Sequence, residues 1–196
     1  VYAIHFWGYP ALAAGPFRLL DAVGASPLKA FQAVNLAAIF ILGLALNRLF
    51  RSPGKALFGV GLFMLCGGGL YFNWSSPECL SAALLLAGLA LYTSGAPIAG
   101  AVLAGLAGQQ NPTILVFFGF APLLHLLLDY DARRSVRANL MHVLQRRYLL
   151  GIAAGVAVFA LPMLFNLYQF GVPNIIAKLF SDTSMIGRAR LHYFFF

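Results

Sequence analysis

Long apolar segments separated by short polar breaks constrain this chain more than any other feature of its sequence. A bilayer core about 30 Å thick requires roughly 20 apolar residues when it is crossed by an α-helix. Within that core only helices and closed barrels satisfy their backbone hydrogen bonds, and these segments lack the alternation typical of barrel strands. The sequence therefore predicts an all-α, polytopic helical membrane protein. The uncharged segments are 28–46 (apart from Lys29 at its edge), 56–72, 79–128 and 148–170.

The composition agrees with this fold class and excludes several others. Charged residues make up 9% of the chain and apolar residues 61%, whereas soluble domains are about a quarter charged. The net charge is +8, but the basic residues lie at the ends of the apolar segments, so we expect contact with anionic membrane lipids and no nucleic-acid partner. The sequence has no phosphate-binding loop, nucleophile elbow or metal-type cluster of His and Cys, so we expect no cofactor and no metal site.

Two basic segments predict the topology, because positive residues favour the cytoplasmic side of a membrane. Residues 48–55 contain three basic side chains and residues 129–147 contain five arginines. If both are cytoplasmic, an even number of spans connects them. Residues 97–128, about 32 in number and roughly 48 Å long as a helix, are too long for one span, and Pro112 predicts a break near 108–112. We therefore expect about six membrane segments: 28–46, 56–72, 79–92, 97–108, 113–128 and 148–168.

The two ends of the chain then lie on the outer side. Residues 2–23 are aromatic and apolar but contain Pro10 and Pro16, which favours an interfacial segment that is helical only over 17–23. The chain is interpreted as one membrane domain, divided into an outer interfacial segment (1–25), transmembrane helices (26–168) and the start of an outer loop (169–196). Because it begins with Val1 rather than Met, we expect it to be a fragment of a longer protein.

Few side chains in the apolar segments could carry chemistry. Glu78 is the only acidic residue among the first five spans and their short connections. It follows Ser76 and Pro77, so its charge could stabilise the positive end of a helix that is capped by Ser76. Alternatively, it could contact a ligand. Gln109, Gln110 and Asn111 are amides at membrane depth, where polar groups face either another helix or a cavity. For Glu78 and for the amides, both interpretations stay open on the sequence alone.

Two further features concern packing. Gly151 and Gly155 have the spacing typical of closely packed membrane helices. His125 lies near the cytoplasmic end of a predicted helix, where we expect an interfacial position. Neither feature by itself predicts a ligand site.

The order of these elements resembles the GT-C class of membrane glycosyltransferases, particularly the bacterial relatives of protein mannosyltransferases and aminoarabinose transferases. The similarity is carried by His5 with Tyr9-Pro10 in an outer segment, by Ser76-Pro77-Glu78 at a helix start, and by a Gly-rich helix with Gly105 that ends in a polar turn. Gln110 and Asn111 stand in that turn where the family often has lysine. The resemblance implies substrate binding by His5, Tyr9, Glu78, Gln110 and Asn111, and a catalytic acidic residue upstream of Val1.

The resemblance implies transfer of a sugar from a polyprenyl-phosphate carrier to an acceptor at the outer face of a bacterial inner membrane. A lipid-linked sugar donor and membrane lipids are the expected partners. The alternative is a transporter or flippase-like polytopic membrane protein, for which a broken helix with amides near the midplane is equally suitable. A non-catalytic membrane assembly subunit is a third interpretation, since candidate catalytic residues are few.

Overall fold

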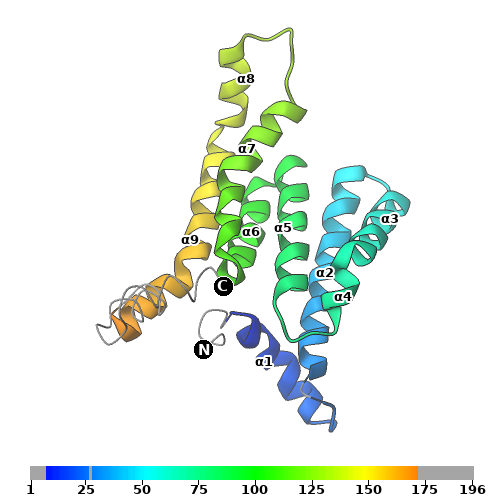
Figure 1. The fold of residues 1–196 in the computed structure, drawn as a ribbon. Coiled ribbons are helices and arrows are strands. Elements are labelled where there is room, and N and C mark those ends of the chain that lie inside the picture. The colour runs from blue at the N-terminus through cyan, green and yellow to red at the C-terminus, as the bar shows by residue number, and fades with distance from the viewer. Residues whose placement is uncertain (1–7, 27, 172–196) are drawn as a thin grey trace, which may run out of the picture.

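A computed structural model describes residues 8–26 and 28–171, and every regular element in this part of the chain is helical (Figure 1). The predicted all-α fold class is confirmed. His5 and most of the segment 169–196 lie outside the described residues. The α-helices are α1 (Gly8–Asp21), α2 (Leu28–Phe50), α3 (Pro53–Phe63), α4 (Gly69–Phe72), α5 (Glu78–Thr93), α6 (Pro97–Gln110), α7 (Phe117–Leu128), α8 (Val136–Val143) and α9 (Arg146–Phe170). A π-helical turn, Met64–Gly68, joins α3 to α4, and a 3₁₀ helix, Pro112–Val116, precedes α7.

Three helical stretches in the described chain are long and apolar enough to cross a membrane: Leu28–Phe50, Pro53–Phe72 and Arg146–Tyr168. Glu78–Thr93 and Pro112–Leu128 are apolar but shorter. Much of the apolar surface faces outward rather than into the protein. In the most apolar window of Pro53–Phe72, for example, only 11% is buried. A helix that is apolar on its outward face is typical of a lipid environment, because water would not solvate that face.

Successive helices run up and down, so the chain has two distinct ends (Figure 1). At the end where α1 lies, called here the α1 end, are the connection 73–77 and the break at Asn111. At the opposite end, called the α8 end, are the connections 51–52, 94–96 and 129–135. Both basic segments lie at the α8 end, which is the arrangement that the charge distribution predicts.

Small residues let α6 pack closely against α5 on one side and α9 on the other. A Cβ atom on Gly100 would lie 2.5 Å from the carbonyl oxygen of Gly88 in α5. A Cβ atom on Gly155 in α9 would lie 2.5 Å from the carbonyl oxygen of Ala101, and one on Gly151 would lie 2.8 Å from that of Pro97. The predicted close packing at the glycine pair of α9 is therefore confirmed, and it places α6 at the centre of the bundle.

The predicted discontinuity near Pro112 is also confirmed. Helix α6 ends at Gln110, and Asn111 has an extended backbone with φ −138° and ψ 101°. The Oδ1 atom of Asn111 accepts hydrogen bonds from the backbone N–H of Thr113 (3.2 Å) and from its hydroxyl (2.7 Å). The first of these bonds satisfies the backbone N–H of Thr113 at the start of the 3₁₀ helix. Pro112 has no N–H, so the break leaves no unpaired backbone donor at that residue. A second interruption was not predicted: the span 56–72 contains the π-helical turn, in which Gly67 has φ +119°.

The structure corrects one expectation about the polar segments and shows an additional helix in another. Helix α1 runs without interruption from Gly8 to Asp21, so the prediction that it is helical only over 17–23 is wrong. Pro10 lies in the first turn, where backbone N–H groups have no partner within the helix, and Pro16 removes only one later hydrogen bond. The basic segment 129–147 contains α8, whose first turn is capped by Ser135: its Oγ accepts from the N–H of Ala138 at 3.2 Å.

Candidate functional site

A cavity of about 1120 Å³ lies at the α1 end, between α1, the start of α2, the connection 73–77, the start of α5 and the end of α6. We call it the polar cavity. Of the five predicted substrate-binding residues, the structure brings four to its wall: Tyr9, Glu78, Gln110 and Asn111. These residues come from α1, α5, α6 and the break after α6, so only the folded chain places them together.

A hydrogen-bond network holds α1 against the rest of the bundle. The hydroxyl of Tyr9, which is 1% exposed, donates to Oδ1 of the buried Asn35 in α2 at 3.0 Å. Asn35 in turn donates through Nδ2 to the carbonyl oxygen of Phe72 at 2.9 Å. The ring of Tyr9 also packs on Phe31, with 4.9 Å between ring centroids. One wall of the polar cavity is therefore fixed by bonds among α1, α2 and the end of α4.

Tyr9 acts as a neutral hydrogen-bonding group in this network. Burial raises the pKa of its hydroxyl from 10.0 to about 12, although the hydrogen bond to Asn35 acts in the opposite direction. Burial disfavours the charged phenolate, so the hydroxyl keeps its proton at neutral pH. Tyr9 is therefore not suited to act as a general base, and because its single O–H donates to Asn35, it can offer a cavity ligand only an acceptor.

The three amides after Gly108 have different roles, which answers the question left open by the sequence. Gln109 donates through Nε2 to the carbonyl oxygen of Val158 in α9 at 2.6 Å, so it forms an interhelical hydrogen bond. Gln110 is 2% exposed and lines the polar cavity, and its amide lies so close to Gly8 that a Cβ atom there would clash with it. Asn111 also lines the cavity, while its Oδ1 caps the following 3₁₀ helix.

Glu78 is an exposed carboxylate on the cavity wall, at the first residue of α5. The expected N-cap by Ser76 is wrong: Pro77 occupies the N-cap position, and no side chain there accepts from the helix. The hydroxyl of Ser76 instead donates to the carboxylate of Glu78. Because Pro77 delays the helix start by one residue, Ser76 lies too far upstream to reach the first free N–H groups. Glu78 still complements the positive end of the helix dipole.

Ser81 is a wall residue that the sequence analysis did not single out. It lies one turn after Glu78 on α5, and its Oγ atom is buried without a hydrogen-bond partner in the described part of the chain. A buried hydroxyl without a partner costs about 1–3 kcal/mol. A polar ligand in the cavity could offset this cost. Ser81 follows Glu78 by three residues, which places the two side chains on one face of a helix. This spacing was the sequence signal that could have identified Ser81 as a wall residue.

The chemistry available at this cavity is hydrogen bonding plus one negative charge. Glu78 is its only acidic wall residue, and no His or Cys of the described chain lines it, so these residues do not form a metal-ligand set. Two amides, three serine hydroxyls, a threonine and a tyrosine supply neutral donors and acceptors. The rest of the wall is apolar and includes Phe31, Leu85 and Ile114, so the cavity offers a group of polar side chains beside an apolar surface.

A second, apolar groove of about 600 Å³ lies along α2, α3, α5 and α7. Its wall is almost entirely leucine, phenylalanine and alanine, for example Leu46, Phe63 and Leu86. Ala82 lines both this groove and the polar cavity, and it lies between Leu86 and Ser81 on α5. The two hollows are therefore neighbours, with Ala82 in the wall of each.

No protein-family model matches this chain, and neither the curated proteins nor the solved structures contain a significant match to it.

Proposed function

We propose that the protein is a membrane glycosyltransferase that transfers a sugar from a polyprenyl-phosphate carrier to an acceptor at the outer face of the membrane. The observation that supports this most is the pair of adjacent hollows, one polar and one apolar, that meet at Ala82. A lipid-linked sugar has a hydroxyl-rich head and a long apolar tail. The head requires hydrogen-bonding groups at the membrane boundary, and the tail requires an apolar surface facing lipid.

In this proposal the wall residues bind and orient the polar head. Gln110, Asn111 and Glu78 all line the cavity. Amides hydrogen-bond sugar hydroxyls or phosphate oxygens, and the carboxylate accepts a hydrogen bond from a hydroxyl of the sugar or acceptor. In this proposal the protein is a multi-pass protein of a bacterial inner membrane. Its basic α8 end lies in the cytoplasm, because positive residues favour that side, and the polar cavity therefore lies on the outer side.

The direct test is Glu78→Gln, which removes the charge and keeps the shape. We expect transfer of radiolabelled sugar from polyprenyl phosphate by the full-length protein in membranes to fall at least tenfold, about 1.4 kcal/mol in the barrier. Asp21→Asn at the end of α1 is the matched control, because Asp21 lies at the same end of the bundle and does not line the cavity. Near-normal transfer by Glu78→Gln at unchanged membrane abundance would limit Glu78 to its role at the helix start.

A transporter or flippase-like protein is the second candidate, and the break between α6 and the 3₁₀ helix favours it. Broken helices that line a cavity often form transport sites, and Asn111 at this break lines the polar cavity. Reconstituted vesicles distinguish the two candidates. A transporter moves the lipid-linked sugar across the bilayer without cleaving it, whereas the proposed enzyme releases polyprenyl phosphate when an acceptor is present.

A further inference from the structure

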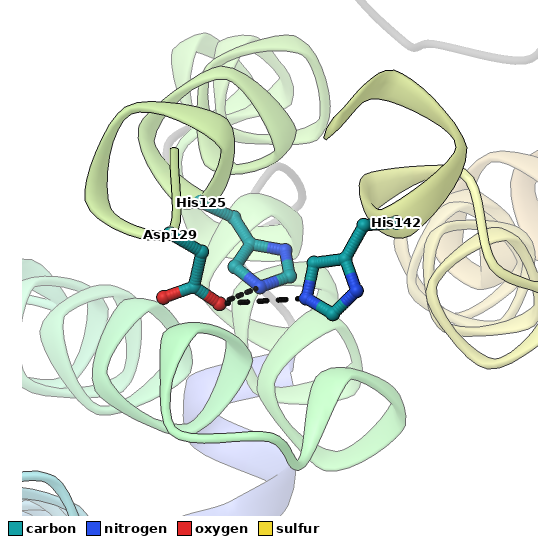
Figure 2. Close-up of side chains that lie close together, drawn as sticks. All are labelled: His125, Asp129 and His142. Atoms are coloured by element: carbon teal, nitrogen blue, oxygen red, sulfur yellow. Dashed lines mark hydrogen bonds and ion pairs between the residues drawn. The ribbon is translucent and has the colours of Figure 1, made fainter. Parts of the chain in front are cut away.

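Three potential metal-ligating side chains converge at the α8 end, at the opposite end of the bundle from the polar cavity (Figures 1 and 2). His125 belongs to the last turn of α7, Asp129 follows that helix directly, and His142 belongs to α8. One ligand atom from each residue, His125 Nε2, Asp129 Oδ2 and His142 Nε2, lies within 4.8 Å of the other two. Figure 2 shows that the three side chains point toward a common centre.

One of the separations between these atoms is close to that of two ligands on a shared ion, and another is a hydrogen-bond distance. Two ligands that each lie about 2.1 Å from a tetrahedral ion are about 3.4 Å apart. Asp129 Oδ2 lies 2.9 Å from His125 Nε2 and 3.7 Å from His142 Nε2. The second distance is too long for a hydrogen bond. It is well suited to two atoms that are bridged by one cation.

His125 is held in place by its surroundings, which pre-orders the group. Its side chain is 1% exposed. The rings of Tyr148 and Tyr92 pack against the imidazole and hold it in place. The hydroxyl of Tyr148 lies 3.2 Å from Nε2, so a bound ion would take the lone pair that this hydroxyl faces. Asp129 is 47% exposed and His142 is 31% exposed. One side of the group is therefore rigid and buried, and the other is open to the medium.

We propose that His125 Nε2, Asp129 Oδ2 and His142 Nε2 form a binding site for one divalent transition-metal ion of the Zn²⁺ type. Two imidazoles with one carboxylate are a ligand set that zinc accepts, and the open side leaves a fourth position for water. Hard cations such as Mg²⁺ prefer oxygen ligands, so the two imidazoles select against them. The sequence spacing gave no sign of this site because α8 and the loop before it bring His142 back onto α7.

The ion would join α8 to α7 and so fix the loop 129–135. Asp131 in that loop is not part of the ligand set: it pairs with Arg134 at 3.2 Å and accepts a hydrogen bond from the backbone N–H of Arg133 at 2.9 Å. Asp131 is therefore a matched control, since it is an acidic residue of the same loop whose loss removes one negative charge without removing a ligand.

The test is direct metal binding by the full-length protein, purified in detergent without an affinity tag. The protein is dialysed against Zn²⁺ and then against metal-free buffer, and the retained zinc is measured by mass spectrometry. We expect about one ion per chain for the wild type and for Asp131→Asn, and at least tenfold less for Asp129→Asn and His142→Gln. In a parallel sample, Co²⁺ should give the strong visible absorption of a four-coordinate site, and this absorption should be lost in the same two variants.

Asp129 and His142 were chosen because they are partly exposed, so their substitution leaves the rings of Tyr92 and Tyr148 packed against His125. Circular dichroism of each variant confirms that it keeps the wild-type helix content before its zinc is compared. Wild-type protein without retained zinc would overturn the proposal. Equal zinc in the wild type, Asp129→Asn and His142→Gln would overturn it as well, because the ion would then be bound elsewhere.

Discussion

Replacing Gly155 by alanine tests whether backbone contact between α6 and α9 holds the bundle together. The added Cβ atom would lie 2.5 Å from the carbonyl oxygen of Ala101 and 2.5 Å from the ring of Phe118, about 1 Å closer than the shortest ordinary contact of 3.4 Å. The ring can rotate, but the carbonyl belongs to a helix backbone and cannot. The two helices must therefore separate.

The expected magnitude follows from two opposing effects. Overpacking of this kind lowers the free energy of unfolding by about 1–3 kcal/mol. The higher helix propensity of alanine raises it by roughly 0.5–1 kcal/mol relative to glycine. The mid-range values give a net loss of about 1.3 kcal/mol, which should lower the Tm of the purified protein by roughly 3–5 °C. Gly119→Ala in α7 is the matched control, because nothing lies within 4 Å of a Cβ atom there.

The two variants should therefore shift the thermal unfolding of the protein in opposite directions. Gly119→Ala should gain about 0.5–1 kcal/mol from propensity alone, whereas Gly155→Ala should lose stability. If both variants were stabilised by a similar amount, α6 and α9 would not be in backbone contact at Gly155, and the described packing of the bundle would be refuted.

Three further predictions use the α1 end and the basic segments. Tyr9→Phe leaves Oδ1 of the buried Asn35 without its donor, so the free energy of unfolding should fall by about 1–3 kcal/mol; an unchanged Tm would contradict the network. Ser81→Ala removes a buried hydroxyl that has no partner in the described chain, so stability should stay or rise while binding of the lipid-linked donor weakens. With both native cysteines replaced, Gly54→Cys should resist an impermeant thiol reagent added outside intact cells and Val23→Cys should react; the reverse pattern would end the proposed orientation.

The features that could be predicted from the sequence are those set by local chemistry over many residues. Uninterrupted apolar segments dictate helices in a membrane, and Pro112 after three amides dictates a break. Both are present in the structure. The grouping of Tyr9, Glu78, Gln110 and Asn111 at one end followed from the alternating direction of the helices. The π-helical turn at Gly67 was missed because no proline marks it.

The features that could not be predicted depend on contacts between distant residues or on one residue of register. Helix α1 continues through Pro16 because the remaining hydrogen bonds suffice. Ser76 does not cap α5 because the helix begins one residue later than its sequence indicates. His125 is buried because Tyr148, from a helix beyond the basic loop, covers it. No periodicity in the sequence reports such a contact.

We propose that the polar cavity and the apolar groove together bind a lipid-linked sugar, and photocrosslinking at Ala82 tests this binding. A photoreactive benzoylphenylalanine replaces Ala82, which lines both hollows. In the control protein it replaces Leu57 instead, which is 72% exposed on the outward face of α3. After irradiation of native membranes, the attached lipids are identified by mass spectrometry. We predict that polyprenyl-phosphate lipids are strongly enriched at position 82 relative to position 57. Bulk phospholipids in the same proportion at both positions would contradict the account.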